Sequence, residues 1–325
     1  MIVSLLQRNN FIGFILFPLL IIGLWFPYIL EPGMTLYYYD QNPMPLYKPL
    51  LHLFQSNAYI GLLCMFGAMV LSMVIMSVLN STYRMFEKRS SVYLLLFIVF
   101  SSLLPQFQQF NPMVFATIFL VMAVYSLYKL YKNEYELRAV YEAGFCFAIA
   151  SLFYVHSIFL SVFIFAGIIN LVPFNWRQWM SGIFGLITPY LFVVSWAFIT
   201  DSLPVLLQTF EANMFVWHSS GEISTLFYVI AAYITIVFIG ALLFSFSGYI
   251  KKVALQKYYF LLFLLVVFTA ILYVVIPGVS IEVFYFAIIP LCFYITNYII
   301  AMRNWLIPEI IILLLLGLRI VMVLM

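Results

Sequence analysis

Two carboxylates and one lysine follow the first long apolar segment of the chain. Glu31 ends that segment in the sequence EPG, and Asp40 follows three consecutive tyrosines. A carboxylate placed beside a bound hydroxyl can act as the general base that removes its proton. Lys48 is the only lysine or arginine between positions 31 and 55, and a point cation suits a phosphate group. Structural roles stay open: Glu31 as a helix cap, Asp40 in a turn, Lys48 extended along an apolar surface.

The three histidines of the chain add candidate binding groups. His52 lies four residues after Lys48, so a helix places both on one face. His218 follows a tryptophan, and His156 sits in the sequence SLFYVHSIF. A lone histidine in such a place more often has a hydrogen-bonded structural role, and the functional alternative puts His156 in the lining of a polar cavity with the glutamines and asparagine of PQFQQFN. Spacings such as H-x-x-x-H or D-x-D do not occur, so we predict no metal or other cofactor, with a divalent ion left open.

The elements that carry these residues must be membrane helices. Only 8% of the residues are charged and 66% are apolar, which is too little polar surface for a soluble domain of 325 residues. About 20 apolar residues cross a bilayer as a helix. The sequence predicts an all-α, polytopic transmembrane bundle of about eleven spans, which form a single domain over residues 1–325. They are 11–30, 56–79, 91–108, 112–130, 139–155, 157–173, 180–200, 225–247, 258–276, 282–301 and 305–325.

The distribution of charge predicts the orientation of the spans. All lysines and arginines except Lys48 and Arg319 lie before the first span, in every second gap or, for Lys129, at the span end that borders such a gap. Positive charge marks the cytoplasmic side of a membrane protein. We therefore expect a cytoplasmic N-terminus and a C-terminus on the outer side. The three histidines, Asp40 and Glu31 then all face outward.

Two outer loops are long enough to hold structure of their own. The first, 31–55, has apolar residues at helical spacing from Leu46 onward. The fourth, 201–224, has a similar apolar series after Pro204. Each loop is predicted to contain a short helix that lies on the outer interface.

The order of these features resembles that of membrane glycosyltransferases of the GT-C class. The resemblance rests on the first loop with its acids and PLYKPLLHLF, on the paired short spans of SLLPQFQQFNPMVFATIFLV, and on the helix pair around SLFYVHSIFLS. The first loop lacks the Asp-Glu pair of that class, so a single acid takes its place. The chain also looks like an uncharacterised family of bacterial polytopic inner-membrane proteins.

The resemblance implies transfer of a sugar from a polyprenyl-phosphate lipid at the outer face of a bacterial inner membrane. Asp40, with Glu31 as substitute, takes the role of base. By the same resemblance, Lys48, His52 and His218 contact the phosphate, and His156 lines the sugar pocket. Two other classes stay open: a non-catalytic membrane subunit of an envelope secretion or assembly complex, and a transporter of lipid or another hydrophobic solute. The basic loops carry few charges each, so nucleic acid is not an expected partner.

Overall fold

The computed structural model of the chain describes residues 10–30, 38–87, 90–133, 136–215, 225–276, 279–302 and 306–324. Regular structure in these ranges is entirely helical, which confirms the predicted all-α class. The α-helices are α2 (Asn10–Leu30), α3 (Tyr38–Gln41), α4 (Tyr47–Ser56), α5 (Ala58–Tyr83), α6 (Val92–Leu103), α7 (Pro105–Gln108), α8 (Pro112–Tyr128), α9 (Leu137–Phe153), α10 (Val162–Leu171), α11 (Trp176–Ile199), α12 (Leu203–Phe215), α13 (Thr225–Phe244), α14 (Val253–Val275), α15 (Ile288–Ala301) and α16 (Leu306–Leu324). Two 3₁₀ segments, η1 (Val155–Ser161) and η3 (Ile281–Ala287), and a π-helical segment, η2 (Ser245–Tyr249), complete the structure.

Several of these helices are long and apolar enough to cross a membrane. Within the described residues there are five, namely Ala58–Tyr83, Trp176–Ile199, Tyr228–Ser247, Val253–Val275 and Ile281–Ala301. Shorter apolar helices cover Leu16–Leu30, Val92–Leu103, Pro112–Tyr128 and Val155–Leu171. Every predicted span coincides with at least one helix. The chain thus has the helices of a polytopic membrane protein, and the number of eleven crossings stays a prediction.

A proline divides the predicted span 91–108 into two helices. Leu104, directly after α6, is extended, with φ −104° and ψ 139°. The ring of Pro105 disfavours a helical conformation for the residue before it, so α6 stops there. Pro105 then opens the short helix α7, and the side chain of Asn111 caps α8 by accepting a hydrogen bond from the backbone N–H of Met113. The segment between α6 and α8 is therefore a structure of its own.

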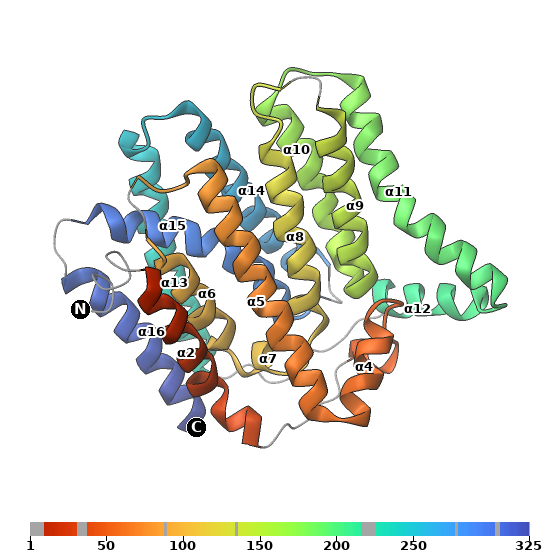
Figure 1. Cartoon of the computed structure of the whole chain (residues 1–325), viewed down its shortest axis with the longest axis horizontal. Helices are drawn as coiled ribbons and strands as arrows, with labels where there is room; N and C mark the ends of the chain where they lie inside the picture. Colours follow the sequence, from red (N-terminus) through yellow and green to blue (C-terminus); the bar gives the residue numbers. More distant parts are fainter. Residues whose placement is uncertain are drawn as a thin grey trace.

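Both predicted loop helices are present. α4 occupies the predicted position in loop 31–55 and buries Tyr47, Leu51 and Phe54, whose spacing of three and four residues forms one face. α12 occupies the first part of loop 201–224. Figure 1 shows α4, α7 and α12 at one end of the bundle, the lower end as drawn. We call this end the α4 end.

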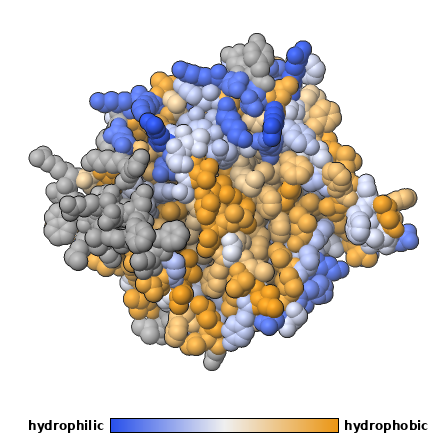
Figure 2. Space-filling model, viewed as in Figure 1, coloured by the Kyte–Doolittle hydropathy of each residue, from blue (hydrophilic) through white to orange (hydrophobic). Residues whose placement is uncertain are grey.

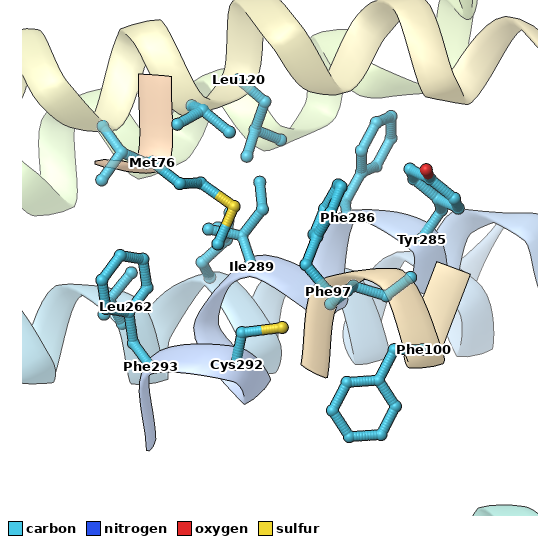
Figure 3. Close-up of a cluster of buried hydrophobic side chains, with 14 of the residues drawn as sticks. Met76, Phe97, Phe100, Leu120, Leu262, Tyr285, Phe286, Ile289, Cys292 and Phe293 are labelled. Atoms are coloured by element: carbon cyan, nitrogen blue, oxygen red, sulfur yellow. The ribbon is translucent and has the colours of Figure 1, made fainter. Parts of the chain in front are cut away.

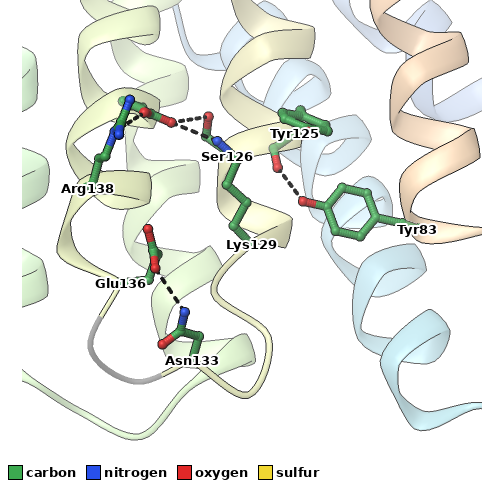
Figure 4. Close-up of polar contacts among 8 residues, drawn as sticks. Tyr83, Tyr125, Ser126, Lys129, Asn133, Glu136 and Arg138 are labelled. Atoms are coloured by element: carbon green, nitrogen blue, oxygen red, sulfur yellow. Dashed lines mark hydrogen bonds and ion pairs between the residues drawn. The ribbon is translucent and has the colours of Figure 1, made fainter.

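Basic side chains gather at the opposite end. Arg84 directly follows α5, and Arg177 lies in the first turn of α11. Lys129 and Arg138 both pair with Glu142 of α9, at N–O distances of 2.9 and 2.8 Å (Figure 4). Figure 2 shows hydrophilic surface over this end and a broad apolar surface below it. We call the end defined by these four cations the basic end. These four cations therefore lie at one end of the bundle, as the sequence predicts.

One apolar core joins the helices between the two ends. Figure 3 shows the buried side chains of Met76, Phe97, Leu120 and Phe286 close together, contributed by α5, α6, α8 and η3. Lipid chains are as apolar as these residues, so close packing rather than the hydrophobic effect holds helices together within a membrane. η3 and α15 lie at the centre of this packing, since the segment Ile281–Ala301 is the most buried of the long apolar helices.

α9 and α11 approach each other through glycines. A Cβ atom added at Gly144 of α9 would collide with the carbonyl oxygen of Gly182, and one added at Gly185 would collide with that of Tyr141. Only glycine leaves room for this backbone contact, which is the usual way small residues let membrane helices pack closely. The contact sets the position of α11, and α11 in turn leads into α12 at the α4 end.

Candidate functional site

The first loop is held against the bundle at the α4 end. The side-chain amide of Asn213 in α12 donates a hydrogen bond to the carbonyl oxygen of Asn42 at 2.7 Å. The backbone N–H of Leu46 donates to the carbonyl oxygen of Leu152, at the end of α9, at 3.2 Å. Residues far apart in the sequence therefore fix the segment that carries Asp40.

Asp40 is buried beneath this loop and accepts a hydrogen bond from a tyrosine. The hydroxyl of Tyr47 donates to Asp40 Oδ1 at 2.9 Å and also lies 3.4 Å from the carbonyl oxygen of Phe110. Burial, and then the neighbouring carboxylate of Asp40, raise the pKa of Tyr47 well above its usual value. Tyr47 is therefore a neutral hydrogen-bond donor at any physiological pH, and it orients the Asp40 carboxyl group.

Lys48 and His52 lie on the other side of α4. Both side chains are exposed, whereas Tyr47 and Leu51 of the same helix are buried. The prediction that Lys48 and His52 share a helix face is consistent with this pattern. The structure does not bring them into the buried surroundings of Asp40.

His156 is fully buried in η1, with its ring 5.2 Å from that of Tyr154. The polar residues expected beside it have other contacts. Asn111 caps α8 and donates from its side chain to the carbonyl oxygen of Gln106, at 3.4 Å. The side-chain amide of Gln108 donates to the carbonyl oxygen of Leu24 in α2, at 2.8 Å. The other two predicted site residues, Glu31 and His218, lie outside the described residues.

Arg319 is a candidate that the sequence reasoning left aside as an exception inside the last span. Its side chain is only 3% exposed, and Nη2 donates to Oε1 of Gln108 and lies 3.5 Å from the carbonyl oxygen of Leu24. Among the residues that the structure describes, Nε has no hydrogen-bond partner and no carboxylate pairs with the guanidinium. A buried cation without an anion is costly inside a membrane protein. An arginine within an apolar helix was the signal that could have identified it.

Glu282 is a second buried ionisable residue that the sequence reasoning did not single out. It lies in η3, is 2% exposed, and its Oε2 atom has no hydrogen-bond partner in the described part of the chain. η3 packs against α7, α8 and α14. Glu282 therefore adds a carboxyl group to the α4 end of the bundle.

A small apolar cavity lies beside α7, with a volume of about 230 Å³. Thr235 is the only residue of its lining with a polar side chain. The walls come from α6, α7, α13, α14, η3 and α15, and include Leu103, Phe107, Ile230, Ile234, Phe238, Phe284 and Ile288. Such a cavity suits a hydrocarbon group better than a polar one.

The segment from Leu104 to Phe110 connects these features. Phe107 forms part of the cavity wall, and the next residue, Gln108, binds the guanidinium of Arg319. The carbonyl oxygen of Phe110 accepts a hydrogen bond from the hydroxyl of Tyr47, the same hydroxyl that donates to Asp40. The rings of Phe110 and Tyr47 stack with their centroids 5.8 Å apart. A carboxyl group, a cation that has no carboxylate partner within the described ranges, and an apolar cavity therefore adjoin one short segment. We call this arrangement the 104–110 site.

Comparisons with protein-family models, with curated proteins and with solved structures found no match. Within the described residues, no three His, Cys, Asp or Glu side chains lie close enough together to hold a metal ion. The geometry of the 104–110 site is therefore what supports a function.

Replacing Tyr47 with phenylalanine tests the support of Asp40. Tyr47→Phe removes the donor to Asp40 and keeps the stacked ring, so we expect a loss of about 1–2 kcal/mol in stability. Thermal unfolding in mild detergent measures this loss. The matched control is Tyr59→Phe, because Tyr59 is 61% exposed. Equal unfolding temperatures for the two variants would show that the hydrogen bond contributes nothing.

Proposed function

We propose that this protein is a GT-C-like glycosyltransferase that uses a polyprenyl-phosphate-linked sugar at the outer face of a bacterial inner membrane. The supporting observation is that Leu104–Phe110 adjoins a buried carboxyl group, a buried cation with no carboxylate partner among the described residues, and an apolar cavity. A lipid-linked sugar carries the matching groups, which are a sugar, a phosphate and a hydrocarbon chain.

In the proposed reaction, Asp40 takes the proton from the acceptor hydroxyl. The freed oxygen attacks the anomeric carbon, and the bond from that carbon to the phosphate oxygen breaks. The lipid phosphate leaves with the electron pair of that bond. Arg319 stabilises the negative charge that develops on the leaving phosphate, because a guanidinium binds phosphate with two parallel hydrogen bonds. Glu31 remains the substitute base of the proposal.

The remaining predicted residues take peripheral roles in the proposal. Lys48 and His52, exposed on α4, face the headgroups of the outer leaflet and meet the incoming lipid phosphate there. His218 has the same role, and His156 supports the sugar pocket from η1. The proposed topology has eleven crossings with the basic end in the cytoplasm, the N-terminus inside and the C-terminus outside.

Binding of undecaprenyl phosphate to the purified protein in lipid nanodiscs tests the proposal. We expect Arg319→Gln to weaken binding by at least about tenfold, because a charge-assisted contact to phosphate is lost. Arg319→Lys keeps the charge and should restore part of the affinity. The matched control is Arg177→Gln, which removes an exposed cation at the basic end.

The outcome separates the three classes of function. If Arg319→Gln unfolds at the same temperature as the unaltered protein and binds the lipid equally well, Arg319 does not contact the phosphate. Tight binding without transfer to any acceptor would favour a transporter of the lipid. Absence of binding together with a stoichiometric protein partner in mild detergent would favour a subunit of an envelope complex.

A further inference from the structure

A buried glutamine lies between the cation of the 104–110 site and helix α2. Gln108 is the last residue of α7 and is 5% exposed. Its side-chain Nε2 donates to the carbonyl oxygen of Leu24 at 2.8 Å, and its Oε1 accepts from Nη2 of Arg319. A glutamine amide donates from its nitrogen and accepts at its oxygen, so only one orientation of the amide satisfies both contacts. Gln108 thus connects a donor of α16 with an acceptor of α2.

Two hydrogen bonds hold the segment of Gln108 against one face of α2. The backbone N–H of Phe110 donates to the hydroxyl of Tyr28 at 3.1 Å, and Tyr28 lies one helical turn after Leu24. Pro27 in the same part of α2 has no N–H to donate, and groups outside a membrane helix commonly compensate for such a loss. The position of the Gln108 amide is therefore fixed by the packing of its segment.

Gln108 satisfies a donor of the Arg319 guanidinium without cancelling its charge. An amide is neutral, and within the described ranges Arg319 has no carboxylate partner and its Nε has no hydrogen-bond partner. Glutamate has nearly the same size, but it would meet the guanidinium with a full negative charge. An ionised carboxylate also has no hydrogen to donate to Leu24. The chain therefore has a neutral residue at the position where an anionic one would neutralise the cation.

We propose that Gln108 is the specificity-determining residue that keeps Arg319 available to an anionic lipid. This inference rests on the proposed function, in which Arg319 contacts the phosphate of the lipid. The neutral amide positions the guanidinium, and Nε is left to donate to a phosphate oxygen. The site then prefers a polyprenyl phosphate to the uncharged polyprenol, and glutamate at position 108 abolishes that preference.

Gln108→Glu in the full chain tests this role. Binding of undecaprenyl phosphate and of undecaprenol, which lacks the phosphate, is measured in lipid nanodiscs together with thermal unfolding. We expect at least about tenfold weaker binding of undecaprenyl phosphate, because the new carboxylate pairs with the guanidinium and repels the phosphate. Binding of undecaprenol should not change. The unfolding temperature should not fall, because a buried cation gains an anion.

Two further variants separate charge from structural support. Gln108→Leu removes both contacts and adds no charge, so it should lower the unfolding temperature and weaken binding of undecaprenyl phosphate less than Gln108→Glu does. Gln256→Glu is the matched control, because Gln256 is exposed on α14 and its Nε2 also donates to a backbone carbonyl, that of Ile250, at 2.8 Å. This control should bind undecaprenyl phosphate like the unaltered protein.

Equal binding of undecaprenyl phosphate by Gln108→Glu and Gln256→Glu would overturn the inference. So would a loss of both lipids in Gln108→Glu, or an unfolding temperature as low as that of Gln108→Leu, because each result assigns Gln108 a purely structural role. Failure of the proposed phosphate contact gives a different result: the unaltered protein then binds undecaprenyl phosphate no better than undecaprenol, which overturns both proposals. Binding that Gln108→Glu abolishes, without sugar transfer, would contradict the enzyme and support the role of Gln108.

Discussion

Asp40→Asn is expected to reduce sugar transfer by about 10²- to 10⁴-fold while the protein still inserts and folds, which is the usual contribution of a general base. Asparagine has nearly the size of aspartate, and its side-chain oxygen can still accept the hydrogen bond that Tyr47 now donates to Asp40. An amide cannot take the proton of the acceptor hydroxyl. The variant therefore removes the chemistry and leaves the geometry in place.

The measurement is the rate of transfer from a polyprenyl-phosphate sugar in nanodiscs, with thermal unfolding recorded for each variant. Asp201→Asn is the matched control, because Asp201 is exposed and its positive φ of 50° suits asparagine equally well. If Asp40→Asn keeps full activity, Glu31 would be the base instead, and the activity of Glu31→Gln tests that assignment. Full activity of both variants would end the catalytic proposal.

Gly185→Leu is expected to have the largest effect on stability. Even a Cβ atom at this position meets the carbonyl oxygen of Tyr141 and lies 3.0 Å from the backbone nitrogen of Phe145. Backbone atoms of α9 cannot move aside as a flexible side chain can, so α9 and α11 must separate. Overpacking of this kind costs about 1–3 kcal/mol, and a leucine should exceed that range.

The loss should also reach the α4 end. α11 leads into α12, and Asn213 of α12 holds the first loop through the carbonyl oxygen of Asn42. A displaced α11 should therefore lower transfer as well as the unfolding temperature. Gly67→Ala is the matched control, because nothing lies within 4 Å of a Cβ added at Gly67 and alanine is a better helix former. Similar unfolding temperatures for both variants would contradict the close α9–α11 contact.

The positions of the helices follow from the sequence itself. The length of each apolar segment can be read from neighbouring residues, and each predicted span accordingly contains a helix. The cations next to the segment ends can be read in the same way, and Arg84, Lys129, Arg138 and Arg177 lie at one end of the bundle. The helix in the first loop was also predictable, since Leu51 and Phe54 have helical spacing along one face. These features depend on residues within a few turns of each other.

The candidate site depends on contacts that no local pattern contains. Arg319 meets Leu24 across 295 positions of the chain, and Gln108 meets Leu24 across 84. The sequence could show an arginine in the last span and a glutamine in a polar segment, but their meeting results from the packing of α2, α7 and α16 around α6. The separation of buried Asp40 from exposed Lys48 has the same origin.

The sequence by itself thus determined a helical membrane protein with sorted charges and an acid in its first loop, because hydropathy and periodicity act over short distances. Only the tertiary structure decided which polar groups share a site. It buried Asp40 under Tyr47, left Arg319 without an anion in the described part of the chain, and placed an apolar cavity beside Phe107. The physical reason is that side chains inside a bundle take the partners that helix packing brings near them.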